Sequence, residues 1–157
     1  MIELLDPPLF HLQARITCLL LVAILACPVH IRAATEFRNA FDGSILNVAP
    51  RTGEELTDAV LAFHADGTNP YLADAAAILA GKKLYQTWCQ SCHMPDGSGR
   101  IGPSLIGDTF TYERVVTDQG MFEVIFGGAG GAMQSFAKRI SQDDMLKIIA
   151  YIRTLKK

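Results

Sequence analysis

Residues 89–93 read Cys-Gln-Ser-Cys-His, and this stretch decides how the rest of the sequence is interpreted. Cys89 and Cys92 stand three positions apart and His93 follows at once, which is the C-x-x-C-H spacing of covalent c-type haem attachment. Two thiols at this spacing, just after a helix end, can each form a thioether with one haem vinyl group. The imidazole of the next residue then stands over the iron as its proximal ligand. The motif therefore predicts one covalent haem c held by Cys89, Cys92 and His93.

Two other uses of a close cysteine pair compete with haem attachment. A redox-active pair is expected within a thioredoxin-like β-α-β pattern, which this sequence does not show. A zinc site needs four ligands, and outside the motif an exported chain offers only the distant His64, without the spacing of a zinc finger. Haem attachment is therefore the favoured interpretation.

The apolar run at residues 16–26, Ile-Thr-Cys-Leu-Leu-Leu-Val-Ala-Ile-Leu-Ala, has the length of the apolar part of an export signal. It is too short to span a bilayer, which takes about 20 apolar residues. Small residues at Ala33 and Ala34 offer a cleavage site, so residues 1–33 are predicted to be a signal peptide and the mature protein to be periplasmic. Two anchored alternatives remain: an uncleaved anchor, and a lipoprotein modified at Cys27.

Export also explains the cysteine count. The chain has four cysteines, of which Cys18 and Cys27 fall in the predicted signal, so the mature chain keeps Cys89 and Cys92. One close pair does not make a disulfide framework of the kind that staples small secreted domains. Another group should therefore occupy these two thiols.

Composition narrows the classes of partner. The chain has 157 residues, 50% of them hydrophobic and 19% charged, and its net charge is −2. Two basic and two acidic residues lie within residues 1–33, so the mature chain has the same net charge. A balance of this kind does not indicate a protein that binds nucleic-acid phosphates. We expect no nucleic-acid partner.

The hydrophobic pattern predicts an all-α fold with long loops and no strands. Helices are expected at residues 54–64, at 74–88 and around 120–126. The last helix is expected to begin after Ser141, which forms an approximate capping box with Asp144. It then carries one apolar stripe, made of Met145, Ile148, Ile149, Ile152 and Leu155.

A haem iron also needs its sixth ligand identified, and Met133 is the favoured candidate. It follows a glycine-rich loop with few side chains to obstruct a flat macrocycle, and a thioether is a soft ligand that raises the reduction potential. Met94 adjoins the proximal histidine and cannot reach the opposite face, whereas Met121 and Met145 are better explained as core residues. His64 is expected to be a surface residue at the end of the first short helix, without a ligand role.

Over residues 74–157 the sequence resembles the class I c-type cytochromes. Gly81 and Tyr85 match the positions at which the first helix of that family crosses the last, and Ile148 and Tyr151 match their partners on the last helix. A small residue at such a crossing allows close approach of the helices. The resemblance implies a cytochrome c domain at residues 74–157, preceded by an N-terminal extension, residues 34–73, with one short helix.

The resemblance also assigns a role to Pro103. It matches the family proline whose carbonyl accepts the N–H of the proximal imidazole, an interaction that would fix the tautomer of His93 and strengthen it as an iron ligand.

A narrower resemblance is to the cytochrome c-L group. It is carried by residues 120–133, by Asp144-Met145-Leu146, by Asn69-Pro70-Tyr71 and by the Thr111-Tyr112 stretch. Proteins of that group take electrons from pyrroloquinoline-quinone (PQQ) methanol dehydrogenases, including lanthanide-dependent ones. One departure is Gln134-Ser135-Phe136, which lacks the Gly-Pro continuation expected after the ligand methionine.

The resemblance implies a periplasmic one-electron carrier and not an enzyme. Its donor would be a PQQ-dependent methanol or other alcohol dehydrogenase, and its acceptor a terminal oxidase or another cytochrome. Two alternatives stay open at this point. One is a general periplasmic cytochrome that serves another dehydrogenase, and the other is a haem protein with an open sixth site that binds a small ligand.

Overall fold

The computed structural model describes residues 35–155, which belong to one compact unit. The predicted signal peptide, with Cys27, lies outside the described residues. Within the described range, no helix is both long enough and apolar enough to cross a bilayer.

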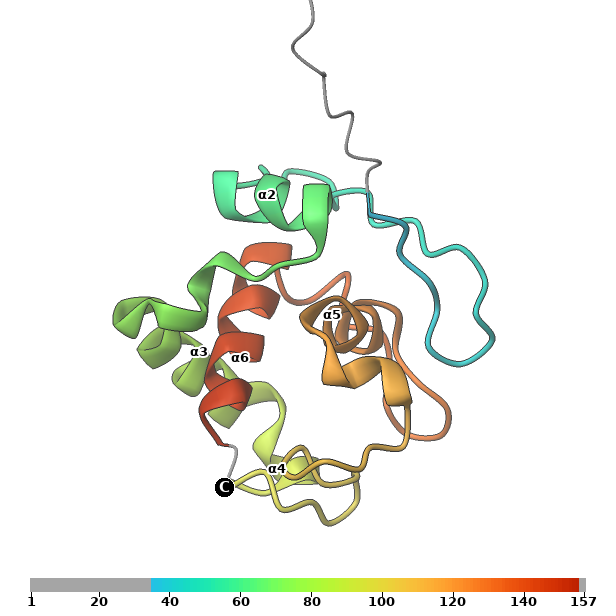
Figure 1. The fold of residues 1–157 in the computed structure, drawn as a ribbon, viewed down its shortest axis with the longest axis vertical. Coiled ribbons are helices and arrows are strands. Elements are labelled where there is room, and N and C mark those ends of the chain that lie inside the picture. The colour runs from blue at the N-terminus through green and yellow to red at the C-terminus, as the bar shows by residue number, and fades with distance from the viewer. Residues whose placement is uncertain (1–34, 156–157) are drawn as a thin grey trace, which may run out of the picture. The chain divides into compact units, whose positions relative to one another are not determined.

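The described residues form helices joined by loops, which confirms the predicted all-α class (Figure 1). Within them, β pairing is limited to an isolated bridge between Arg38 and Ile45. Along the chain the elements are α2 (Asp58–Asp66), the 3-10 helix η1 (Pro70–Ala73), α3 (Ala75–Trp88), α4 (Gln90–His93), the 3-10 helix η2 (Glu113–Val116), α5 (Asp118–Gly127) and α6 (Gln142–Thr154).

Side-chain caps fix where the two longest helices begin. The carboxylate of Asp74 accepts hydrogen bonds from the backbone N–H groups of Ala76 and Ala77, so α3 begins at Ala75. The hydroxyl of Ser141 accepts from the N–H of Asp144 at 3.1 Å, which confirms the predicted start of α6. Such caps satisfy N–H groups that have no partner within the helix.

The predicted helix at residues 54–64 is wrong at its start. Thr57 caps α2 by accepting from the N–H of Val60, so the helix begins at Asp58. Glu54 instead lies in a turn, where its carboxylate accepts from the backbone N–H groups of Arg51 and Gln142. Glu54 therefore gains tertiary partners that a helical position would not give it.

The crossing of α3 and α6 is the main helix–helix contact of the fold, and the two helices lie side by side in Figure 1. Gly81 makes it possible, because a Cβ atom there would lie much closer to the Lys147 carbonyl oxygen than van der Waals contact allows. Next to it, the rings of Tyr85 and Tyr151 meet edge to face at 5.3 Å between centroids. The helix crossing that the resemblance to class I c-type cytochromes predicted at Gly81 and Tyr85 is therefore confirmed.

The N-terminal extension packs into the core. Phe37 and Phe63 are buried and contact Phe122 of α5, with ring centroids 5.5 and 5.0 Å away. His64 packs against the edge of the same aromatic cluster, and its Nε2 lies 2.8 Å from the side-chain oxygen of Gln142. The expectation that His64 is a surface residue is therefore wrong, because a partly buried imidazole here joins α2 to α6.

Asp143, at the start of α6, ties the extension to the helix that crosses α3. Its carboxylate accepts hydrogen bonds from Thr57 at 2.8 Å and Tyr71 at 2.6 Å, and it pairs with Lys147 at 2.6 Å. Burial by itself would raise the pKa of Asp143, but the hydrogen bonds from Lys147, Tyr71 and Thr57 lower it below the usual aspartate value.

We expect Asp143→Asn to lower the free energy of unfolding near neutral pH by about 1–3 kcal/mol, the range for hydrogen bonds to a charged group. A carboxylate with a lowered folded-state pKa contributes stability above the unfolded-state pKa and loses it as the pH falls through the folded-state value. The variant should therefore lose less stability than the wild type between pH 5 and pH 3. Denaturant titrations across this range measure both effects, with Asp108→Asn in an exposed loop as control. Parallel pH curves for the variant and the wild type would contradict the prediction.

Replacing Gly81 by alanine should separate α3 from α6. The added methyl group overlaps backbone atoms of Lys147 that no side-chain rotation can move. Forcing extra atoms into a packed interface costs about 1–3 kcal/mol, and more when backbone must shift. Thermal unfolding measures this loss, and the exposed neighbouring substitution Lys82→Ala should leave stability within about 0.5 kcal/mol of wild type. An unfolding midpoint for Gly81→Ala equal to that of Lys82→Ala would refute the close-contact argument.

Candidate functional site

The C-x-x-C-H residues form a single helical turn directly after α3. The N–H groups of Cys92 and His93 both donate to the carbonyl of Cys89, at 3.2 and 3.0 Å, and this turn is α4. Cys89 and Cys92 are free thiols that are each partly buried. The turn therefore presents two thiols and one imidazole from adjacent positions.

A strained turn ends α4 directly after His93. Met94 has a φ of 65°, which is rare for a residue other than glycine. The hydroxyl of Tyr85 donates to the Met94 carbonyl at 2.7 Å and holds this turn in place. The chain thus leaves α4 in a fixed direction, toward the loop that carries Pro103.

His93 is 7% exposed, and its ring is oriented by Pro103. Nδ1 of the ring lies 2.9 Å from the Pro103 carbonyl oxygen. Because a carbonyl can only accept a hydrogen bond, Nδ1 carries the proton and Nε2 keeps a lone pair. Gly102 lies against the ring, since a Cβ at that position would be 2.5 Å from Cε1 of His93. The imidazole is thus held on one side by backbone and offers Nε2 as a ligand atom.

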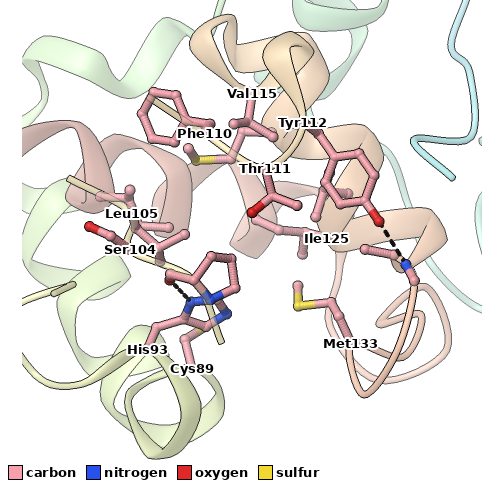
Figure 2. Close-up of a pocket in the computed structure, with 16 residues that line it drawn as sticks. Cys89, His93, Ser104, Leu105, Phe110, Thr111, Tyr112, Val115, Ile125 and Met133 are labelled. Carbon is pink, nitrogen blue, oxygen red and sulfur yellow. Dashed lines mark hydrogen bonds between the residues drawn. The ribbon is translucent and has the colours of Figure 1, made fainter. Parts of the chain in front are cut away.

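An apolar cavity opens beside His93 (Figure 2). Its empty space is about 830 Å³, part of it open to solvent, and it adjoins a second hollow of about 890 Å³. The residues that line both are Cys89, His93, Pro103, Gly130 and Met133. The two hollows therefore form one slot between the motif and the glycine-rich loop.

Met133 enters the slot from the wall opposite His93. Figure 2 shows its thioether and the imidazole pointing toward the same open space from different parts of the chain. Met133 lies in the loop between α5 and α6, and its carbonyl accepts a hydrogen bond from the N–H of Ala129 at 2.9 Å. The structure thus brings together the residues that the sequence suggested for this site, which are Cys89, Cys92, His93, Pro103 and Met133.

Three of the other candidate ligands lie outside the slot. Met94 and His64 line neither hollow, and Met145 is fully buried among the core residues of α6. Met121 is 3% exposed and lines the wall of the cavity as part of α5.

The environment of Cys89 is strongly apolar. Burial, and secondarily the nearby Cys92, raises the pKa of the Cys89 thiol to about 12. A raised pKa is the opposite of what activates the thiolate of a catalytic or redox-sensing cysteine. The observation disfavours the redox-active interpretation of the pair.

Several cavity residues were not predicted from the sequence. Phe110, Thr111 and Tyr112 line the slot from the segment before η2, and Val115 lines it from η2 itself. This segment has no helical or strand periodicity, so no pattern indicates which side chains face inward. The hydrogen bond from the Tyr85 hydroxyl to the turn at Met94 was also not predicted, because the sequence identified Tyr85 only as a residue of the helix crossing.

Comparisons with known proteins agree with this geometry. Residues 76–152 match the family described as "Cytochrome C oxidase, cbb3-type, subunit III". Cytochrome c-L of Methylorubrum extorquens is 38% identical over 120 residues, which cover 76% of this chain and 61% of that protein. The chain thus spans about three-fifths of the length of this curated relative.

Two solved structures are similar in both fold and sequence. Cytochrome cL of Methylophaga aminisulfidivorans gives a TM-score of 0.74 at 37% identity, covering 76% of this chain and 80% of that one. Cytochrome cL of Hyphomicrobium denitrificans gives a TM-score of 0.74 at 40% identity, covering 80% of this chain and 76% of that one.

The chain therefore belongs to the c-type cytochromes, a class of electron-transfer proteins, and within them to the cytochrome c-L group. It holds one covalently bound haem c. The described residues fit this cofactor, because the slot combines two free thiols, an imidazole with an available Nε2 and an apolar lining.

Gly102→Ala should disturb this site by pushing the imidazole away from Pro103. We expect a shifted haem absorption spectrum and a loss of about 1–3 kcal/mol in unfolding free energy, the range for overpacking. Absorption spectra and thermal unfolding of the haem-loaded variant measure these effects, with the exposed Ser98→Ala in the same loop as control. A Gly102→Ala spectrum identical to wild type would show that the ring position does not depend on Gly102.

Proposed function

We propose that this protein is a periplasmic one-electron carrier that accepts electrons from a PQQ-dependent methanol dehydrogenase and passes them toward a terminal oxidase or another cytochrome. The observation that carries the proposal is the pairing of His93 and Met133 on opposite walls of one apolar slot, in a chain of the cytochrome c-L group. A site with both axial positions filled suits electron transfer and leaves no open position for a substrate.

In this proposal each site residue has a distinct role. The thiols of Cys89 and Cys92 would attach the haem through two thioethers, and Nε2 of His93 and the Met133 sulfur would hold its iron. When bound, the haem iron supplies the one-electron Fe(III)/Fe(II) couple. Pro103 keeps the proton on Nδ1 of His93, so the ligand nitrogen stays available and the ring keeps its orientation.

The surrounding residues limit rearrangement between the two oxidation states. His93 is held by Pro103 and Gly102, and the turn after it is held by Tyr85. The apolar residues of α5 and α6 at the cavity wall, Met121, Val124, Ile125 and Ile152, keep water away from the ligand atoms. Fixed ligands in a dry site favour fast electron exchange, because little has to move when the charge changes.

The proposed location and partners follow from the sequence together with the family. An export signal at residues 1–33 would deliver the chain to the periplasm, where c-type cytochromes and quinoprotein dehydrogenases meet. Docking should be transient and use a small interface, as is usual for electron-transfer encounters.

Removing the Met133 thioether tests the ligand assignment. The oxidised wild type should show the weak far-red absorption band of sulfur bound to ferric iron, and Met133→Ala should lose it. The variant should also have a lower reduction potential, since a thioether ligand raises it. Met145→Leu, a volume-conserving change in the core, should keep both properties. Rapid carbon monoxide binding by the reduced wild type at neutral pH would indicate an open sixth site instead and overturn the assignment.

The donor is tested by stopped-flow reduction of the oxidised protein by purified methanol dehydrogenase, in separate experiments with calcium-dependent and lanthanide-dependent enzymes. Reduction by either enzyme in the presence of methanol is the expected result. If neither enzyme reduces the protein at micromolar concentration, the donor assignment fails while the carrier assignment stands.

A further inference from the structure

We propose that Tyr112 is a positioning residue that holds the Met133 loop through the backbone N–H of Gly130. The inference rests on the proposed ligand role of Met133 and adds a residue from a distant part of the chain. Tyr112 precedes η2, whereas Gly130 lies 18 residues later in the loop after α5.

The contact between these residues is direct. The N–H of Gly130 donates to the phenolic oxygen of Tyr112 at 2.9 Å, and the bond is visible at the edge of the cavity in Figure 2. Gly130 also has little free space around it. A Cβ atom there would lie 3.1 Å from the Tyr112 oxygen and 3.2 Å from the ring of Phe41. The loop backbone is thus held between a hydrogen-bonding phenol and an aromatic ring of the extension.

The loop needs such an external contact because its own sequence does not restrict it. Gly128 and Gly131 have φ values of 84° and 79°, in the region that favours glycine, and Gly127 and Gly130 lie beside them. Glycines leave a chain with more accessible conformations than other residues do. A hydrogen bond at Gly130, three residues before Met133, therefore restricts the segment that sets the position of the thioether.

Tyr112 is itself attached to a rigid part of the fold. Tyr112 is the N-cap of η2, and its carbonyl accepts a hydrogen bond from the N–H of Val115 within that helix. In η2, Arg114 makes two hydrogen bonds to the carboxylate of Glu123, at 2.7 and 2.8 Å. The Glu123 side chain is fully buried in α5 and also accepts from the backbone N–H of Arg38. The phenol is therefore connected to α5 by a charged pair.

Loss of the phenolic oxygen should let the thioether leave the iron more often. A single hydrogen bond of this kind changes the population of the detached state by roughly 2- to 10-fold. In Tyr112→Phe, carbon monoxide should then bind the reduced protein faster by the same factor, because it needs the vacated position. The far-red band of the oxidised variant should weaken at a lower pH than in wild type, and the reduction potential should fall.

The experiment compares haem-loaded Tyr112→Phe with haem-loaded Tyr71→Phe. Tyr71→Phe is a matched control, because it also removes one phenolic oxygen with a hydrogen bond, here to Asp143, at a residue that lines neither hollow. Both variants are measured for carbon monoxide association, for the pH dependence of the far-red band, for reduction potential and for thermal unfolding. The expected result is an effect on the three haem properties in Tyr112→Phe only.

Three results would overturn the inference. If Tyr112→Phe matches wild type in carbon monoxide association and in the far-red band, the phenol does not position the loop. If Tyr71→Phe changes these properties equally, the effect reflects general stability and not positioning. A wild type that lacks the far-red band overturns the Met133 assignment and the inference with it, so the two failures are distinguishable.

Discussion

The close contact between α3 and α6 at Gly81 is the constraint on which the site depends. α4 follows α3 immediately, so the position of α3 sets where Cys89, Cys92 and His93 lie. α6 in turn contributes Ile152 to the wall of the slot. Had the two backbones been kept apart by a side chain, the motif would move away from that wall. The absence of a side chain at Gly81 thus permits the main helix crossing, and through it the place of the motif relative to α6.

Pro103 and Met133 reach the slot on loops, and the fold compensates for this with hydrogen bonds to backbone groups. Pro103 fixes the imidazole through its carbonyl, and Tyr85 fixes the turn at Met94 through another carbonyl. Tyr112 reaches a backbone N–H in the opposite loop. Such contacts do not depend on the identity of the loop side chains. They allow a short chain with long loops to keep the two proposed ligand residues on opposite walls of one cavity.

The sequence predicted the elements whose signals are local. Asp74 and Ser141 are side-chain caps, so α3 and α6 were predicted correctly. Residues 89–93 have a spacing with one dominant chemical use, and the haem c that this spacing predicts is confirmed by the family. The start of α2 was missed because Glu54 gains tertiary partners that no local pattern shows. The partial burial of His64 was missed for the same reason, since its partner Gln142 is 78 residues away. Local patterns identify elements, whereas long-range polar partners have to be seen in the structure.

The extension is held by buried polar groups as much as by apolar packing. Gln142 is 1% exposed, and it donates to the Val48 carbonyl while its own backbone N–H donates to Glu54. Glu123 is fully buried and accepts from the N–H of Arg38. A buried polar group without a partner costs about 1–3 kcal/mol. The Gln142 side chain therefore depends on the extension, which supplies both His64 and Val48 as its partners, whereas Glu123 keeps Arg114 as a partner outside the extension. Since Glu123 also holds Arg114 of η2, the extension supports the wall of the haem slot although it contributes none of the proposed iron ligands.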